Sequence, residues 1–359
     1  MPFSGSKTKA MSSGVLKSKI LKAEALRLGF SHCGLAPAEP VDEAYMQHYE
    51  DWLRRGWHGD MHYLENHLAL RRDPRLLLSG AKTVISLAMS YNPGLAETQP
   101  ALAWYAQGRD YHEVVRARAR RLLEKSLPGS PCQEGKGAST SRDGSFPDRE
   151  GEGRVCVDTA PVLEKYWAWR CGLGWIGRHT QLVIPHEGSA FFLAEILMTV
   201  EADYYDEPQT HPGPPYKGGS RASGKNSLPK EGWGGSPCGT CHRCLDACPT
   251  RAITDEGLDA RRCLSYLTIE HRGPLPPSIA PYLRECFYGC DRCLRACPHL
   301  SRSAASPVPD FLPSPALLAM TPTQWTQLSR EDYQSLFRGS AVKRAKFEGL
   351  RRNIDLRAK

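Results

Sequence analysis

Apolar residues at helical spacing mark three stretches of the N-terminal half as helices. These stretches cover residues 15–29, 42–55 and 110–127. In the first, the apolar positions are Leu16, Ile20, Leu26 and their neighbours. Gly29 suits the end of that helix, and Gly56 suits the end of the second. The third stretch is rich in arginine, which predicts a helix at the surface.

Short apolar runs predict strands. These runs cover residues 82–90, 154–158, 180–185 and 191–200. The last two flank His-Glu-Gly-Ser at 186–189, which predicts a hairpin. Another helix is predicted from Pro161 onward, and the glycine-rich turn GLGWIG at 172–177 follows it. This combination of helices and strands predicts an α+β fold.

Three segments lack this patterning and are predicted to be flexible. They are the polar leader 1–14 and the segments 129–153 and 207–236, which are rich in glycine, proline, serine and charge. Such compositions cannot bury enough apolar surface to offset the entropy lost on ordering. They leave three structured parts: a first domain at 15–206, a cysteine-rich domain at 237–300 and a helical basic tail at 301–359.

The composition is that of a globular protein without a membrane segment. The chain has 359 residues, of which 40% are hydrophobic and 24% charged. No apolar run approaches the ~20 residues of a membrane helix, and the N-terminus shows no apolar signal region. We therefore expect a cytoplasmic location. The net charge is +8, with basic residues concentrated after Arg338, which is compatible either with phosphate contact or with a plain solvated surface.

Cysteine is the most informative residue type. The chain has 13 cysteines, and most lie between Cys238 and Cys297. In a cytosolic chain, this density favours metal ligation over disulfides. One run has the spacing of bacterial ferredoxins. It consists of Cys238, Cys241, Cys244 and Cys248, followed by Pro249. In that pattern three thiolates hold one [4Fe–4S] cubane, and the fourth binds a second cubane.

A second run, Cys290-x2-Cys293-x3-Cys297-Pro298, is one cysteine short of this pattern. Two cubanes need eight thiolates and the two runs supply seven, so the spacing leaves Cys263 or Cys286 as the eighth. Zinc is the alternative metal, but zinc sites usually show two separated Cys-x2-Cys pairs. The remaining cysteines outside the polar segments lie among apolar residues and are predicted to be buried hydrophobes. They are Cys33, Cys156 and Cys171.

The segments CGTCHRCLDACPTRAI, CLSYLTIEHRG and YGCDRCLRACP resemble the iron–sulfur domain of the epoxyqueuosine reductase family. The resemblance extends to WLRRGWHGDMHYL, RRDPRLLLSGAKTVIS, GRDYH, VDTAPVLEKYWAWRCGLGWIG and FRGSAVKRAKFEGLRRN. It therefore covers most of the chain. Two pairs depart from the family pattern. Arg178-His179 stands where the family commonly has Lys-Asn, and His299-Leu300 stands where it usually has Trp-Asn.

This resemblance implies a mixed-sheet cobalamin-binding domain flanked by helices, joined to a bacterial ferredoxin-like domain with two [4Fe–4S] clusters. The implied activity is the last step of queuosine synthesis. An epoxide at the wobble position of tRNA is reduced to an alkene with loss of water. The resemblance also implies a monomer supplied by an external electron donor, such as flavodoxin or ferredoxin with its reductase.

The resemblance also assigns residues. Asp158 of the VDTAP motif is the implied proton donor. Burial beside the apolar face of a corrin would raise its pKa, and the apolar neighbours Val155, Val157 and Pro161 fit this expectation. The position of Asp158 before a helix also fits an N-cap. The implied cobalamin contacts, each of which also fits a plain surface or packing role, are Arg71, Tyr111, Asp158, Ser265, Arg272 and Asp291. We interpret GLGWIG as backbone close to the corrin or to neighbouring structure.

The ferredoxin crossover and the family pattern together divide the cluster ligands into two sets. One set is Cys238, Cys241, Cys244 and Cys297. The other is Cys248, Cys263, Cys290 and Cys293. Two other functions remain open. A reductive dehalogenase-like corrinoid protein would share these cofactors but usually carries an export signal. A ferredoxin-type electron carrier would explain the cysteine runs but not the long upstream part of the chain.

Overall fold

The structure is a computed structural model. It describes residues 15–94, 101–126, 153–208 and 238–357. The predicted leader and nearly all of the two predicted flexible segments lie outside these residues. The described strands are β1 (His32–Pro37), β2 (Thr83–Ser90), β3 (Gly153–Cys156), β4 (Trp175–Ile176), β5 (Leu182–Val183), β6 (Phe191–Met198), β7 (Ile253–Thr254) and β8 (Gly257–Leu258).

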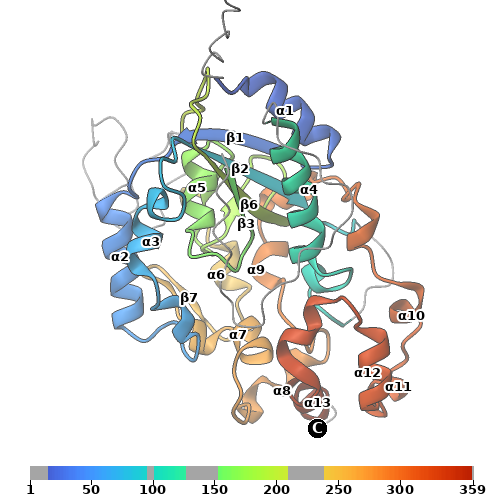
Figure 1. Cartoon of the computed structure of the whole chain (residues 1–359). Coiled ribbons are helices and arrows are strands. Elements are labelled where there is room, and N and C mark those ends of the chain that lie inside the picture. Colours follow the sequence, from blue (N-terminus) through green and yellow to red (C-terminus); the bar gives the residue numbers. More distant parts are fainter. Residues whose placement is uncertain (1–14, 95–100, 127–152, 209–237, 358–359) are drawn as a thin grey trace, which may run out of the picture.

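The helices are short apart from α1, α2, α4 and α13 (Figure 1). They are α1 (Ser18–Arg27), α2 (Glu43–Arg54), α3 (Leu68–Arg72), α4 (Tyr111–Ser126), α5 (Glu164–Arg170), α6 (Arg243–Asp246), α7 (Leu264–Ile269), α8 (Ala280–Leu283), α9 (Arg292–Arg295), α10 (Pro315–Leu318), α11 (Pro322–Thr326), α12 (Arg330–Leu336) and α13 (Lys346–Arg357). The α-helices predicted at 15–29, 42–55 and 110–127 are confirmed as α1, α2 and α4. Among the described residues, no helix is both long and apolar enough to cross a bilayer.

The main sheet has the strand order β1-β2-β6-β3, and each neighbouring pair is antiparallel. The α+β class is confirmed, but these strands form an antiparallel sheet and not a mixed one. Alternate residues of β2 face opposite cores, because side chains alternate along a strand. Ile85 and Leu87 join the core that includes residues of α1 and α4, whereas Val84 and Ala88 join the core that includes α5.

Helix α1 buries a different face from the one that its sequence suggests. Leu21 and Ala25 are buried, whereas Ile20 is 71% exposed and Leu26 is 55% exposed. Ser18 and Glu24 occupy the remaining buried positions, and both have polar partners. The helical pattern was therefore predicted correctly, but its apolar face was not. Ser18 and Glu24, which both have hydrogen-bond partners, occupy buried positions that apolar residues would normally fill.

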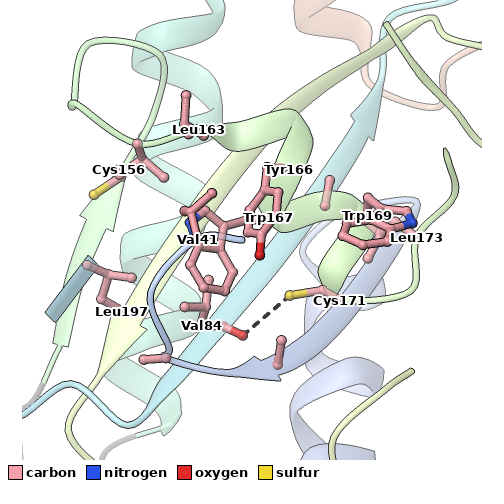
Figure 2. Close-up of a cluster of buried hydrophobic side chains, with 14 of the residues drawn as sticks. Val41, Val84, Cys156, Leu163, Tyr166, Trp167, Trp169, Cys171, Leu173 and Leu197 are labelled. Atoms are coloured by element: carbon pink, nitrogen blue, oxygen red, sulfur yellow. Dashed lines mark hydrogen bonds between the residues drawn. The ribbon is translucent and has the colours of Figure 1, made fainter. Parts of the chain in front are cut away.

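The core beneath α5 contains the large rings of Tyr166 and Trp167, each 1% exposed (Figure 2). Cys156 and Cys171 belong to the same core. Burial raises the pKa of Cys156 to about 12, and the Cys171 thiol contacts the Val84 carbonyl oxygen at 3.5 Å. These two cysteines are buried hydrophobes, as predicted, whereas Cys33 is only partly buried.

The predicted hairpin between 180–185 and 191–200 is wrong. Strand β5 pairs instead with β4 across the glycine-rich turn, and β6 lies between β2 and β3. Gly174 allows the β4–β5 contact, because a Cβ atom there would lie 2.1 Å from the Val183 carbonyl oxygen. Apart from the buried Glu195, strand β6 is apolar on both faces, which suits a central strand and favours pairing with distant strands over a local hairpin. The turn therefore lies close to neighbouring structure.

The segment predicted as a basic tail is part of the folded body. Val342, Leu350 and Ile354 are buried in a third core together with residues of α7 and α8. The Arg352 guanidinium donates to the carbonyl oxygens of Leu267, His271 and Gly273. The segment therefore stabilises the cysteine-rich region, and its basic residues are not all available to a ligand.

Candidate functional site

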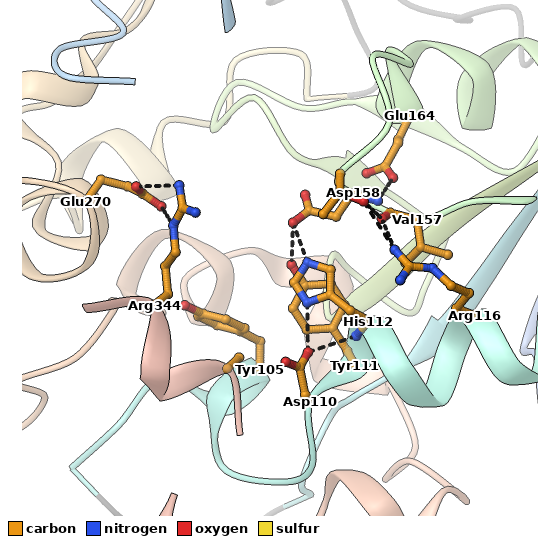
Figure 3. Close-up of polar contacts among 12 residues, drawn as sticks. Tyr105, Asp110, Tyr111, His112, Arg116, Val157, Asp158, Glu164, Glu270 and Arg344 are labelled. Atoms are coloured by element: carbon orange, nitrogen blue, oxygen red, sulfur yellow. Dashed lines mark hydrogen bonds and ion pairs between the residues drawn. The ribbon is translucent and has the colours of Figure 1, made fainter. Parts of the chain in front are cut away.

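Asp158 lies just beyond the end of β3, in a strained backbone conformation. Its φ is +55°, a value that residues other than glycine seldom adopt. The N-cap of α5 is Leu163, so Asp158 does not cap that helix and the N-cap interpretation is wrong. The strain holds the carboxylate where two side chains from the start of α4 meet it (Figure 3). An outlier of this kind is typical of a functional site.

Tyr111 and His112 both bind the same carboxylate oxygen. The Tyr111 hydroxyl donates to Asp158 Oδ2 at 2.8 Å, and His112 Nε2 lies 2.8 Å from the same atom. On its other side, His112 Nδ1 lies 2.7 Å from Asp110 Oδ1. The Tyr111 ring stacks on Phe192 of β6, with centroids 4.3 Å apart. Thus Asp110, His112 and Asp158 form a continuous hydrogen-bonded chain that the sheet helps to fix.

The charges of this chain favour a protonated His112. Burial opposes its protonation, but the hydrogen bonds and charges of Asp110 and Asp158 prevail and raise the pKa of His112 to about 9. Burial likewise disfavours the Asp158 anion, but His112 and Tyr111 prevail and lower the pKa of Asp158. In the chain by itself, the pKa of Asp158 is therefore lowered, and the raised pKa expected beside a corrin stays a prediction. At neutral pH, the proton resides on His112.

Glu164 is the second acid of the site. Its carboxylate accepts a hydrogen bond from the Asp158 backbone N–H. Burial, followed by the Asp158 charge, raises the pKa of Glu164 to about 8. Because 51% of the Asp158 side chain is exposed and both of its hydrogen bonds fall on Oδ2, a reacting group has room to approach this carboxylate. The site therefore combines a protonated imidazole, an accessible carboxylate and a buried carboxyl.

We expect the His112 charge to make stability depend on pH. Its pKa rises from an ordinary 6.5 to about 9 on folding, so the stabilisation is complete below pH 6.5 and is lost as the pH rises through 9. With the exposure of Asp158 taken into account, the loss is about 1–2 kcal/mol. Urea unfolding at pH 6.5 and pH 9 measures it. A His112→Asn variant should lose less stability over this interval; an equal loss would contradict the assignment.

The other carried-over residues have internal partners. Nε of the buried Arg71 donates to the Asn66 carbonyl oxygen at 3.3 Å. The Arg272 guanidinium donates to the carbonyl oxygens of Ile269, Arg344 and Ala345. Asp291 accepts a hydrogen bond from the Trp104 N–H, and burial raises its pKa to about 6. The Ser265 hydroxyl and N–H help to lower the pKa of Cys263 against the effect of burial. Only Tyr111, of these candidates, has a hydrogen bond to Asp158 among the described residues.

The sequence did not indicate three residues that lie near Asp158, namely His112, Glu164 and Arg344. His112 ends the GRDYH motif and Glu164 follows VDTAPVL, so the neighbours of the matched residues were the available signal. Arg344 binds Glu270 through Nε and Nη2, at 2.8 and 2.9 Å, and its charge helps to lower the pKa of Asp158. No local pattern indicates that Arg344 faces this site, because the fold brings it there from the C-terminal segment.

The charges of neighbouring cysteines raise the pKa of the cluster thiols, and the largest of these effects fall within two sets. Burial, followed by Cys238 and Cys241 and then by Cys297, raises the pKa of Cys244 to about 11. The pKa of Cys293 rises through burial and then through Cys263 and Cys290, with smaller effects from Cys244 and Cys248. Helices α6 and α9, which lie within the two runs and carry Cys244 and Cys293, pack together. The donor chemistry of each set, four cysteine thiols, fits a [4Fe–4S] cluster.

Cys286 is oriented differently. Its thiol donates to the carbonyl oxygens of Tyr288, at 3.2 Å, and Gly289, at 3.5 Å. Burial, followed by the Asp291 charge, raises its pKa beyond the usual range for a thiol. A thiol that donates to its own turn is held in the neutral form, whereas a cluster needs a thiolate. Cys286 is therefore a poor match for the eighth ligand.

Comparisons with known proteins point to one family. A family model described as "Epoxyqueuosine reductase QueG, DUF1730" matches residues 71–159, and a "4Fe-4S double cluster binding domain" matches 237–299. The epoxyqueuosine reductase of Cellulophaga algicola is 36% identical, covering 94% of this chain and 97% of that protein. The epoxyqueuosine reductase of Gloeobacter violaceus is 36% identical, covering 93% of each.

Solved structures show the same fold. Epoxyqueuosine reductase from Streptococcus thermophilus is 25% identical, with a TM-score of 0.70 over 94% of this chain and 80% of that chain. An epoxyqueuosine reductase crystallised with a tRNA-Tyr epoxyqueuosine-modified stem loop is 22% identical, with a TM-score of 0.73 over the same shares. This second match supports the fold alone.

Proposed function

The chain belongs to the epoxyqueuosine reductase family, and on that premise we propose that it reduces epoxyqueuosine to queuosine at the wobble position of tRNA. The epoxide carbons become an alkene and the oxygen leaves as water, so the reaction takes up two electrons and two protons. The observation that carries the proposal is the Asp110–His112–Asp158 chain, which supplies protons in a protein that also has two sets of cluster thiols.

The cofactor residues follow from the chemistry of the side chains. The mutual pKa effects of the thiols support Cys238, Cys241, Cys244 and Cys297 as one ligand set and Cys248, Cys263, Cys290 and Cys293 as the other. The accessible Asp158 and its neighbour Tyr111 suit one face of a cobalamin. Arg71, Ser265, Arg272 and Asp291 are the further cobalamin contacts that the family resemblance implies. When bound, the clusters would relay single electrons, and the corrinoid would supply the strongly reducing chemistry that opening a strained C–O bond requires.

Side chains of this site hold the proton and transfer it to the leaving oxygen. As negative charge develops on the leaving oxygen, His112 gives its Nε2 proton to Asp158 Oδ2, which lies 2.8 Å away. Asp158 then protonates the oxygen as a general acid. Asp110 holds the imidazole in place through Nδ1, and Tyr111 fixes the carboxylate. Glu164, with its raised pKa, supports the loop through the Asp158 backbone and is the nearest second source of a proton.

The partner is tRNA, whose anticodon bases can leave the stack and enter a pocket. Arg352 binds internal carbonyls, so the cations that remain for phosphates in this segment are exposed ones such as Lys343 and Lys346. We further propose that the protein acts in the cytoplasm as a monomer. Its electrons come from an external donor such as flavodoxin or ferredoxin with its reductase.

We expect Lys343→Ala combined with Lys346→Ala to weaken tRNA binding. Each lost phosphate contact should reduce the slope of log affinity against log salt by about 1. Fluorescence anisotropy with labelled tRNA at several salt concentrations measures this slope. Lys19→Ala, an exposed cation on α1 away from the C-terminal segment, is the matched control (Figure 1). An unchanged slope in the double variant would mean that this surface is only solvated. Cutting the chain at Gly339 is a poor test, because it removes buried Leu350 and Ile354.

Two rival functions can be separated in one experiment. The reconstituted holoprotein receives an electron source and either epoxyqueuosine-containing tRNA or a halogenated phenol. The proposal predicts alkene formation in the tRNA nucleoside and no release of halide. Halide release without nucleoside conversion would favour a dehalogenase. If the protein transfers electrons to an acceptor but changes neither substrate, it is an electron carrier.

A further inference from the structure

A buried arginine of the first domain reaches the first cluster-binding loop. The Arg178 side chain is 3% exposed, although it carries a positive charge. Its Nη2 donates to the Gly239 carbonyl oxygen at 2.9 Å, between Cys238 and Cys241. Its Nη1 lies 3.1 Å from Asp255 Oδ1 in the β7–β8 turn. The mechanism proposed above gives this cation no role.

The same part of the first domain contacts the other end of this ligand set. The Trp175 ring meets the His299 ring edge to face, with centroids 4.9 Å apart. His299 lies two residues after the proposed ligand Cys297, directly beyond Pro298. Trp175 lies in β4 within the glycine-rich turn, and Arg178 directly follows that turn, so one short segment contacts residues beside Cys238 and beside Cys297.

We propose that Arg178 raises the reduction potential of the cluster held by Cys238, Cys241, Cys244 and Cys297, and thereby favours entry of electrons there. This inference rests on the proposed function, which supplies the cluster. One-electron reduction by the external donor adds a negative charge to the cluster, and a nearby fixed cation stabilises the reduced form more than the oxidised form. Net charge and hydrogen bonds near the sulfurs are known determinants of cluster potential.

Asp255 opposes this effect only in part. Its side chain is 53% exposed, so water screens its negative charge, whereas the guanidinium is shielded from water. The Gly239 carbonyl also holds the guanidinium against the loop between Cys238 and Cys241. Removing the cation and removing its counter-ion should therefore shift the potential in opposite directions. If Arg178 only packed against the loop, the two substitutions would not shift the reduction potential in opposite directions.

The test is an EPR-monitored redox titration of the anaerobically reconstituted full chain, with iron counted in every sample. Arg178→Met should shift the reduction equilibrium of one cluster about tenfold toward the oxidised form, which is ~59 mV for one electron. Asp255→Asn should shift the same signal toward reduction. Arg178→Lys should stay nearer the wild type because it keeps a cation. Arg243→Met is the matched control, since Arg243 is exposed beside Cys244 and should have a smaller effect.

The outcomes separate the alternatives. Full iron content with unchanged potentials in Arg178→Met, or shifts of the same sign in Arg178→Met and Asp255→Asn, would overturn the inference. Loss of one cluster in both Arg178→Met and Arg178→Lys would also overturn it, because Arg178 would then only hold the loop. Absence of cluster iron in the wild-type protein would overturn the proposed function and the inference with it.

Discussion

Cys263→Ser is expected to remove about half of the cluster iron from the reconstituted protein, because one of two [4Fe–4S] sites loses a ligand. Cys263 affects the pKa of Cys290 and Cys293, and Cys248 affects that of Cys263, so the four thiols belong together electrostatically. The measurement is iron and sulfide per chain after anaerobic reconstitution, together with the EPR spectrum of the reduced protein. One cluster signal should disappear and the other should remain.

Cys286→Ser is the matched control for this experiment. Its thiol donates to the carbonyl oxygens of Tyr288 and Gly289, and a serine hydroxyl can make the same contacts. We therefore expect full iron content in Cys286→Ser. If the control loses a cluster while Cys263→Ser keeps both, the eighth ligand is Cys286 and the second ligand set is wrong.

Asp158→Asn is expected to lower turnover by at least ~10²-fold, the usual contribution of a positioned general acid. The amide keeps the size of the side chain and can still accept a hydrogen bond from Tyr111, which donates to Oδ2 in the structure. It cannot receive a proton from His112 and pass it on. Single-turnover conversion of epoxyqueuosine-containing tRNA, followed by nucleoside mass analysis, measures the rate.

Four controls accompany this variant. Asp158→Asn should retain its iron, its cobalamin and its affinity for tRNA, since the change removes an acid and not a fold. Asp203→Asn alters a carboxylate whose hydrogen bonds go to Ser18, near the N-terminus of α1, and should turn over normally. Normal turnover by Asp158→Asn would move the acid elsewhere, with Glu164 as the next candidate.

The sequence predicted local features better than pairings. Helices α2 and α4 and strand β2 follow from patterns within one segment, and the structure has them close to the predicted bounds. The hairpin failed because β6 is apolar on both faces and pairs with distant strands β2 and β3. Periodicity does not identify the partner of a strand, so this arrangement depends on contacts between segments far apart in the chain.

The functional site also combines features that the sequence predicted with features that depend on the fold. The cysteine runs and Asp158 could be named from motifs, because their chemistry depends on residue type and short spacing. The protonation states could not be predicted in this way. Apolar neighbours in the sequence fit a raised pKa of Asp158 beside a corrin, but in the chain itself His112 and Arg344 reach Asp158 through the fold and lower its pKa. The charged segment after Arg338 similarly suggested a solvated tail, although Leu350 and Ile354 are buried.

The most direct test of the proposed function is conversion of the nucleoside itself. Purified protein with both clusters and added cobalamin is incubated with a low-potential electron donor and tRNA that carries epoxyqueuosine, and the digested nucleosides are analysed by mass. We predict that the modified nucleoside loses one oxygen atom and becomes queuosine, and that this conversion stops when cobalamin is omitted. If protein with full iron and cobalamin leaves epoxyqueuosine unchanged, or if conversion proceeds equally without the corrinoid, the account is contradicted.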